Sequence, residues 1–437
     1  MRVRHLPRDD DTCGWIRLLP PRPAPRRLER DERVDWAVVG AGFTGLAAAR
    51  RLAALAPEAR VVVIDAQRAG ESASGRNSGF AVDLSASRSG TDTDGPEVYL
   101  RKRRLNLAGL ALLREAVEGR GIECQWREIG KYHCAADAGN LAEIDAFVRL
   151  LEGLGLEHTV LEGDALARRL GTDHYLRGVH TPHAVMVQPA ALARGLALTL
   201  PQSVTLYEES PVTALQPGRE VRIQCGERTV RARNVILATN GFLPGMGVLG
   251  RRLLPLTLTA SLTRPLTSDE RAAIGDPDDW GVLAAHGMGA TVRYTVDHRI
   301  MMRNTAERWP RLAMSATELE ARRAIHLASI RARFPALGAL AIEHTWSGVV
   351  CMTRNLSPYF GRIAPSIWVS AGYNGSGIAR GTIAGSLLVD HALGVGGPLL
   401  DDIRALATPT WIPPRPFLDI GVALRMRRAR RGLGRDL

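Results

Sequence analysis

The stretch that decides the fold reads VDWAVVGAGFTGLAAARRL and covers residues 34–52. It places three glycines, Gly40, Gly42 and Gly45, between an apolar run and an amphipathic run. In a βαβ unit that binds a dinucleotide, this spacing allows a tight turn, close approach of the pyrophosphate, and close packing of helix on strand. The pyrophosphate then meets the free N–H groups and the positive end of the helix dipole. The stretch therefore predicts a strand, a phosphate-binding turn and a helix.

An acidic residue stands where such a unit needs one. The next apolar strand, RVVVIDA at residues 60–66, ends with Asp65, about twenty residues after Gly45. An acid at this place binds ribose hydroxyls and disfavours a 2′-phosphate. Glycines alone also serve ordinary turns, but strand, helix and acid in this order indicate dinucleotide binding. NAD and FAD both satisfy the pattern up to this point.

Three more stretches favour FAD. ESASGRNSG (71–79) follows the second strand with small residues and one arginine, which suits a phosphate or a flavin edge. VILATNG (235–241) is an apolar strand that ends in small residues. GYNGSGIARGTIAG (372–385) opens a helix predicted to end near residue 393, whose N-terminus would stabilise negative charge on a reduced flavin. An NAD domain needs no such closing element, so we predict FAD.

The predicted cofactor contacts come from these turns and strand ends, and Gly42, Asn240 and Gly375 are expected to line one cleft. The full set is Gly40, Gly42, Phe43, Thr44, Gly45, Asp65, Ala66, Gln67, Ser74, Gly75, Arg76, Asn77, Ser78, Gly79, Val212, Ala238, Thr239, Asn240, Gly241, Gly372, Tyr373, Asn374, Gly375, Ser376, Gly377 and Ile378.

Composition narrows the class of protein. With 437 residues, of which 45% are hydrophobic, the chain exceeds one typical core, so two lobes are expected. Five scattered cysteines form no CxxC pair, and HTPH (180–183) has too few companions for zinc, so we expect no metal and a reducing, cytoplasmic location. No apolar run reaches the ~18 residues of a membrane span. The charge of +12 is read as an arginine-rich solvated surface, with no nucleic-acid partner expected.

The order of patterns predicts an α/β fold in two lobes. A discontinuous Rossmann-like FAD-binding lobe is assigned to residues 34–95, 184–250 and 345–395. An α+β substrate lobe with a large mixed or antiparallel sheet is assigned to 96–183 and 251–344. Residues 1–33 are expected to form an irregular lead-in and 396–437 a basic extension. Helices are predicted at 97–118, 141–154 and 316–333.

Five stretches together resemble the D-amino-acid-oxidase superfamily of FAD-dependent oxidoreductases, and most closely its gamma-glutamylputrescine oxidoreductase branch. They are VVGAGFTGLAAA, SASGRNSG, VILATNGF, WSGVVCMTRNLSPYFGR and GYNGSGIARGTIAGSLL. The resemblance implies oxidation of a C–N bond in a small amine or amino acid: hydride passes to flavin N5 and the imine then hydrolyses. The electron acceptor, molecular oxygen or another, stays open, because the lysine that relatives place over the flavin has no counterpart between residues 253 and 344.

Four residues are the candidates for contact with the substrate: Arg76, His286, Arg293 and Arg303. Arg76 belongs to a motif beside the cofactor. The strands GATVRYTVDHRIMMRNT would present Arg293 or Arg303, whose forked guanidinium suits a carboxylate or phosphonate. Arg293 or His286 would replace the missing lysine. Cys351 lies where some relatives attach flavin covalently, but is interpreted as a buried thiol.

Three alternatives remain from the sequence. The first is an NAD-dependent dehydrogenase of Rossmann type. The second is a tRNA-modifying flavoprotein of the same superfamily, which the basic charge allows. The third is a membrane-surface or interaction role for the tail from residue 418, where apolar residues alternate with arginines but glycines are expected to interrupt a helix.

Overall fold

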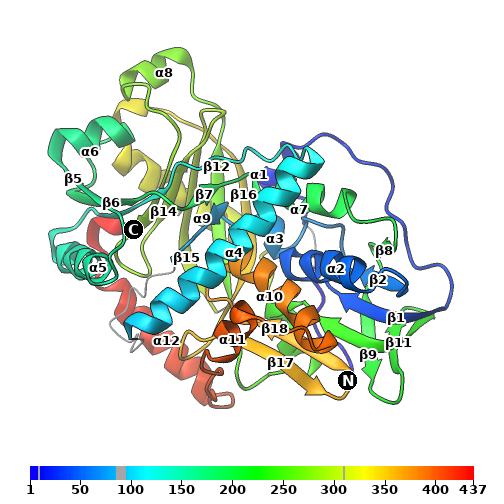
Figure 1. Cartoon of the computed structure of the whole chain (residues 1–437). Coiled ribbons are helices and arrows are strands. Elements are labelled where there is room, and N and C mark those ends of the chain that lie inside the picture. Colours follow the sequence, from blue (N-terminus) through cyan, green and yellow to red (C-terminus); the bar gives the residue numbers. More distant parts are fainter. Residues whose placement is uncertain (8–9, 85–94, 309–310) are drawn as a thin grey trace.

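Two eight-stranded sheets organise the computed structural model, which describes residues 1–7, 10–84, 95–308 and 311–437 (Figure 1). The first sheet has the strand order β17-β18-β11-β1-β2-β8, with β10 and β9 continuing from β11. Its central strands β18, β11, β1, β2 and β8 pair in parallel. The bounds are β1 (Glu32–Val39), β2 (Val61–Ile64), β8 (Val204–Tyr207), β9 (Val212–Gln216), β10 (Val221–Cys225), β11 (Arg228–Leu237), β17 (Tyr359–Ala364) and β18 (Ile367–Ala371).

Helices cover this sheet through contacts that only glycine permits. The helices are α2 (Phe43–Leu55), α10 (Gly377–Leu393) and α4 (Pro96–Arg120). A Cβ atom on Gly385 of α10 would lie 2.0 Å from the Thr44 carbonyl oxygen of α2, and one on Gly109 of α4 would lie 2.1 Å from that of Ala379. The three helices therefore stack with their backbones in contact. The strands beneath are apolar without alternation, as in the fully buried β2, because both faces of the sheet are covered.

The second sheet has the order β16-β12-β15-β14-β13-β4-β6-β5, and only β13 and β4 pair in parallel. Helix α9 (Ala316–Arg333) packs on β12, β15 and β16. The strand bounds are β4 (Lys131–Ala135), β5 (Thr159–Glu162), β6 (Arg177–Thr181), β12 (Leu254–Thr263), β13 (Trp280–Ala284), β14 (Thr291–Tyr294), β15 (Ile300–Glu307) and β16 (Ile342–Met352). A two-stranded sheet pairs β3 (Phe80–Ala81) with β7 (Val185–Met186).

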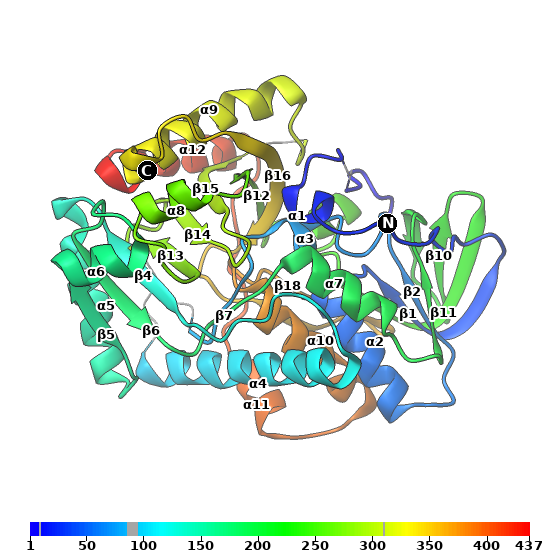
Figure 2. The same ribbon diagram turned by 90° about the horizontal axis from the view of Figure 1, so that it is seen from above.

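The remaining helices surround both sheets (Figure 2). They are α1 (Gly14–Arg17), α3 (Ala73–Arg76), α5 (Leu141–Gly153), α6 (Gly163–Leu170), α7 (Pro189–Leu198), α8 (Ser268–Ala273), α11 (Pro398–Arg404) and α12 (Phe417–Arg430), with 3-10 turns at Ala138–Asn140, Asn240–Met246, Pro335–Leu337 and Gly434–Asp436. Helix α4 joins the two halves of the molecule: Tyr99 belongs to the same hydrophobic cluster as Phe147 of α5, whereas Leu113 and Val117 belong to the cluster that contains Trp36 of β1.

The predicted fold class is confirmed, and the predicted helices α4, α5 and α9 form within two residues of their expected ends. Residues 85–94, assigned to the cofactor lobe, lie outside the described residues. The predicted irregular lead-in contains the short helix α1, whose Trp15 is 1% exposed and packs against Trp346. The expectation that glycines interrupt the tail was wrong, because α12 continues through Gly421. A helical glycine costs only about 1 kcal/mol relative to alanine.

A test of helix length and hydropathy finds no single described helix that could span a membrane. Helices α10 and α11 pass it only as a pair, and the bend between them is 102°.

Candidate active site

A cavity of about 1340 Å³ lies where the two sheets meet. Gly42, Asn240 and Gly375 line it, and they follow the neighbouring parallel strands β1, β11 and β18. The carboxyl ends of parallel strands face the same edge of a sheet, which is where open α/β sheets bind their ligands. Three segments far apart in the sequence thus surround one space.

The glycine turn forms one wall of the cavity. Gly40 adopts φ 109°, and a Cβ atom on Gly45 would lie 1.8 Å from the Gly40 carbonyl oxygen, so neither position accepts a side chain. A Cβ atom on Gly42 would lie 2.6 Å from Ser74 Oγ. Gly42, the N-cap residue of α2, supplies no side-chain cap, and the Phe43 N–H donates to Ser74 Oγ at 3.3 Å, so the N-terminus of the helix and its positive dipole end lie at this wall.

Asp65 lies beside the turn at the end of β2. Its Oδ2 accepts the Ala41 N–H at 2.6 Å, and its Oδ1 accepts the Gln67 N–H at 2.9 Å. Burial, together with the nearby carboxylates of Glu208 and Glu71, raises the pKa of Asp65 to about 6. The side-chain oxygen and nitrogen of Gln67 are buried without hydrogen-bond partners. Asp65 lines the cavity and Gln67 does not, so the carboxylate of Asp65 is the polar group available to a sugar.

Two asparagines fix the opposite end of the wall. Asn240 and Asn374 adopt the left-handed values φ 41° and φ 54°. Asn240 Oδ1 accepts the Gly372 N–H at 2.9 Å, and Asn374 Oδ1 accepts the Thr353 N–H at 2.8 Å. These bonds tie the ends of β11, β16 and β18 together. The following residues start α10, whose N-terminus lines the cavity.

Tyr373 joins this end to the glycine turn. Its hydroxyl forms a 2.9 Å hydrogen bond with Thr44 Oγ1 of α2 and donates to the Ser370 carbonyl at 3.0 Å. Burial raises the pKa of Tyr373 to about 12, so the phenol stays neutral at physiological pH. The turn and the α10 N-terminus are held at a fixed separation as a result.

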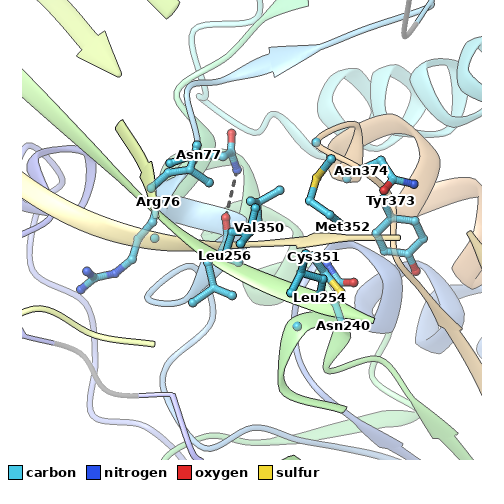
Figure 3. Close-up of a pocket in the computed structure, with 18 of the residues that line it drawn as sticks. Arg76, Asn77, Asn240, Leu254, Leu256, Val350, Cys351, Met352, Tyr373 and Asn374 are labelled. Atoms are coloured by element: carbon cyan, nitrogen blue, oxygen red, sulfur yellow. Dashed lines mark hydrogen bonds between the residues drawn. The ribbon is translucent and has the colours of Figure 1, made fainter. Parts of the chain in front are cut away.

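Arg76 belongs to the lining, but hydrogen bonds hold its guanidinium within the wall of the cavity. Its guanidinium donates to the Glu71 carbonyl at 2.8 Å, the Ser347 carbonyl at 3.0 Å and Asp10 Oδ1 at 2.7 Å. Figure 3 shows this guanidinium pointing away from Cys351 and the residues around it. The arrangement assigns Arg76, predicted as catalytic, to positioning α3 against β16.

The second sheet contributes an apolar wall to the cavity. It consists of side chains from β12 and β16, namely Leu254, Leu256, Val350, Cys351 and Met352 (Figure 3). Burial raises the pKa of the Cys351 thiol to about 12. The thiolate is the nucleophilic form of cysteine, so this raised pKa opposes a covalent bond to Cys351.

The far part of the cavity carries the remaining predicted residues. Arg303 of β15 lines it and donates a hydrogen bond to Thr291 Oγ1 on the paired position of β14. His286 lies in the turn between β13 and β14, and its Nδ1 accepts the Met288 N–H at 3.2 Å. Burial lowers the pKa of His286.

Arg293 lies away from the cavity, contrary to the expected contact with substrate. It is 1% exposed, donates to the Val187 carbonyl oxygen and stands 5.6 Å from the ring centroid of Trp15. The lead-in helix α1 covers this end of β14, which the sequence pattern did not reveal. Burial lowers the pKa of Arg293 to about 10.

Of the predicted cofactor contacts, those that do not line the cavity are Gly45, Gln67, Gly75, Gly79 and Gly372. The others all line it. Gly45 and Gly75 instead lie behind the lining, each in contact with a backbone carbonyl that leaves no room for a Cβ atom.

Among the parts of the lining that sequence reasoning missed, two lie on α4 and α12. One is Lys102 of α4, which is 5% exposed. The other is one face of α12, formed by Leu418, Val422, Met426 and Ala429. The helical spacing of the second group was a usable signal, but Gly421 counted against a helix.

The site fits a dinucleotide with a large ring system. It offers the N-terminus of α2 at the glycine turn, the carboxylate of Asp65 at the end of β2, and a cavity with an apolar wall. These are the needs of a pyrophosphate, a ribose and a flat aromatic ring, respectively.

Comparison with known proteins agrees with this geometry. The family model described as DAO, FAD dependent oxidoreductase, matches residues 35–391. A probable oxidoreductase OrdL of Haemophilus influenzae is 27% identical over 386 residues, 84% of each chain. Gamma-glutamylputrescine oxidoreductase of Escherichia coli is 27% identical over 368 residues, 82% of this chain and 83% of its own. The crystal structure of glycine oxidase from Geobacillus kaustophilus superposes with a TM-score of 0.70 at 20% identity, covering 84% and 96% of the two chains.

Proposed function

The chain belongs to the DAO family of FAD-dependent oxidoreductases, and on this basis we propose that it oxidises a C–N bond in a small amine or amino acid. The observation that supports the proposal is the single cavity that extends from the glycine turn to Arg303. Gamma-glutamylputrescine and glycine, which appear in the names of two similar proteins, both carry an amino group. Family membership also decides between the two cofactors that the sequence left open, and it favours FAD over NAD.

The residues that would hold FAD follow from the geometry. The turn at Gly40 and Gly42, with the α2 N-terminus, would hold the pyrophosphate, and Asp65 would accept the ribose hydroxyls. Asn240 and the α10 N-terminus would face the flavin ring. The chemistry that FAD supplies when bound is acceptance of a hydride from the carbon beside the substrate nitrogen.

Arg303 gives the proposal its substrate class. Its guanidinium donates a hydrogen bond to the Thr291 hydroxyl in the far part of the cavity, which Lys102, Glu143 and His286 also line. A guanidinium binds carboxylates and phosphonates through paired hydrogen bonds. We assign an anionic group to the substrate's remote end and an apolar segment between that group and the amine.

His286 would act as a hydrogen-bond donor. The Met288 N–H donates to its Nδ1, which assigns the proton of the neutral ring to Nε2. The lowered pKa keeps the ring neutral at physiological pH. A neutral ring with its proton on Nε2 and its Nδ1 already bonded does not accept the amine proton, and we expect the substrate to react as the free amine. The value of kcat/KM should therefore rise with pH until the substrate ammonium has lost its proton.

The basic block at residues 101–104 supports a small-molecule substrate over RNA. Arg101 and Arg104 form ion pairs with Asp402, and Arg103 pairs with Asp83. Lys102 is buried at the cavity. The three arginines therefore form ion pairs within the chain, and this use of their charge favours a small-molecule substrate over RNA.

Anaerobic bleaching of the bound flavin tests the function. The holoenzyme is mixed with matched amines that carry or lack a remote carboxylate, and the visible absorbance of the oxidised flavin is followed. We expect bleaching by the carboxylated amines, and the rate at which colour returns in air then distinguishes an oxidase from a dehydrogenase. Arg303→Ala should raise KM at least tenfold for carboxylated amines, while the exposed Arg219→Ala should not. Failure of every amine to bleach the flavin would refute the proposal.

A further inference from the structure

Helix α12 presents an apolar and basic outer face to solvent. Phe417, Ile420, Leu424, Arg427 and Arg431 recur at helical spacing, and we call these five residues the outer face. The side chains of the first three are 67%, 56% and 63% exposed, and Phe417 also reaches the rim of the cavity. In Figure 1 the helix lies at the periphery of the molecule, far from α2 and β1.

This exposure is concentrated in one segment. Among the described residues, five large apolar side chains are at least 49% exposed: Trp411, Phe417, Ile420, Leu424 and Leu198. Four of these five lie within residues 411–424. Single exposed apolar residues need no explanation, but a cluster of them indicates a binding surface.

The opposite face of α12 is already occupied. Leu418, Val422 and Met426 line the cavity. Packing against the body of the protein therefore accounts for one apolar face of the helix and leaves the outer face unexplained.

The charge around the outer face selects its partner. Residues 411–437 contain seven arginines and two aspartates. One of the aspartates, Asp436, is fully buried, and the other, Asp419, pairs with Arg308. A second copy of the chain would place arginines against arginines in a symmetric dimer. A partner that is negatively charged at its surface and apolar inside matches both the arginines and the apolar side chains of the outer face.

We propose that the outer face of α12 binds the surface of an anionic phospholipid bilayer. Apolar side chains on the first two turns and arginines on the turns that follow match the interfacial mode, in which the helix lies in the membrane plane. Phe417, Ile420 and Leu424 insert among the acyl chains, and Arg427 and Arg431 contact lipid phosphates. The tryptophan at position 411 suits the same interface. The cavity, lined by the other face of α12, then opens close to the membrane.

Vesicle co-sedimentation of the full-length holoenzyme tests the proposal. We expect binding to mixed vesicles of phosphatidylcholine and phosphatidylglycerol, and at least tenfold weaker binding to pure phosphatidylcholine or at high salt. Ile420→Ser combined with Leu424→Ser should reduce binding at least tenfold. The matched control is Leu198→Ser, because Leu198 and Leu424 are equally exposed at 63%. The flavin spectrum of each variant reports whether it is folded.

A charge variant tests the second half of the face. Arg427→Gln with Arg431→Gln should remove the preference for anionic vesicles, whereas Arg33→Gln with Arg233→Gln, two exposed arginines of the first sheet, should retain it. Each of these results would overturn the proposal: no binding to either kind of vesicle, binding by the Ile420 and Leu424 double variant that equals that of wild type, or a dimer in sedimentation velocity that this variant abolishes. Capture of an acidic protein by the face without vesicle binding would do so as well.

Discussion

We expect Asp65→Asn to raise the free energy of unfolding of the cofactor-free protein, relative to wild type, more at pH 7.5 than at pH 4.5. The same substitution should weaken FAD binding. In the folded state, burial raises the pKa of this carboxyl from 3.8 to about 6. The folded protein therefore binds the proton more tightly than the unfolded chain does. Stability contributed by this group is greatest at low pH and is lost as pH rises from about 4 to about 6.

The magnitude follows from the pKa. A rise from 3.8 to about 6 corresponds to about 3 kcal/mol of lost stability once both states are ionised. About 1 kcal/mol of this is already lost at pH 4.5, so the difference between pH 4.5 and pH 7.5 is about 2 kcal/mol. The asparagine variant also loses one acceptor, because Asp65 accepts from both Ala41 and Gln67. That cost is the same at both pH values and cancels.

Urea unfolding of the cofactor-free wild type and Asp65→Asn at the two pH values measures this difference. We expect the variant to gain about 2 kcal/mol relative to wild type on going from pH 4.5 to pH 7.5. If the difference in unfolding free energy between the variant and wild type is the same at pH 4.5 and pH 7.5, the argument that burial raises the pKa of Asp65 is refuted. FAD titration is a separate test: losing charged hydrogen bonds of about 1.5–3 kcal/mol should weaken binding at least tenfold. Unchanged affinity would remove Asp65 from the cofactor site and leave the stability argument intact.

Three further outcomes follow from the described contacts. Gly45→Ala should abolish FAD retention, because the added Cβ atom would lie 1.8 Å from the Gly40 carbonyl oxygen. The control Gly119→Ala should retain FAD, because its added Cβ atom meets no other atom within 4 Å. Retention is measured as the ratio of flavin absorbance to protein absorbance in the purified protein. Asp436→Ala should destabilise the protein by about 2–3 kcal/mol in thermal or urea unfolding, because the buried carboxylate accepts from the Ala136 N–H at 2.7 Å and from Asn140; Asp278→Ala, on an exposed side chain, serves as the control and should change little. Acid precipitation should release all flavin into the supernatant from both wild type and Cys351→Ala, because the neutral thiol is expected to form no bond to the flavin ring. Flavin colour that stays in the wild-type pellet but not in the variant pellet would indicate a covalent bond to Cys351.

Most residues of the predicted cofactor half line one cavity, and the sequence could indicate this because the signals are local. A turn that requires glycine, an acid at the next strand end and a helix start each follow from a few neighbouring residues. The structure adds what depends on distant contacts. Whether Gly45 lines the cavity or lies behind it depends on how tightly α2 packs.

The substrate half was harder to predict because it depends on which segments cover a sheet. Arg293 and Arg303 occur on adjacent strands with similar patterns, but α1 covers the first and leaves the second at the cavity. Similarly, Arg76 has the right place in its motif, yet Asp10 and two carbonyls engage its guanidinium. Contacts between segments far apart in the chain decide both cases, and no periodicity encodes them.

The scattering of the first sheet over the chain sets the order in which the protein can be completed on the ribosome. Gly42 is synthesised early, but Asn374 and the α10 N-terminus emerge only after most of the chain has been made, and β18 pairs with β11 only then. A nascent chain that stops before this point has no closed chamber for the coenzyme. Flavin uptake must therefore follow translation of nearly the whole chain, and products of interrupted synthesis should be colourless.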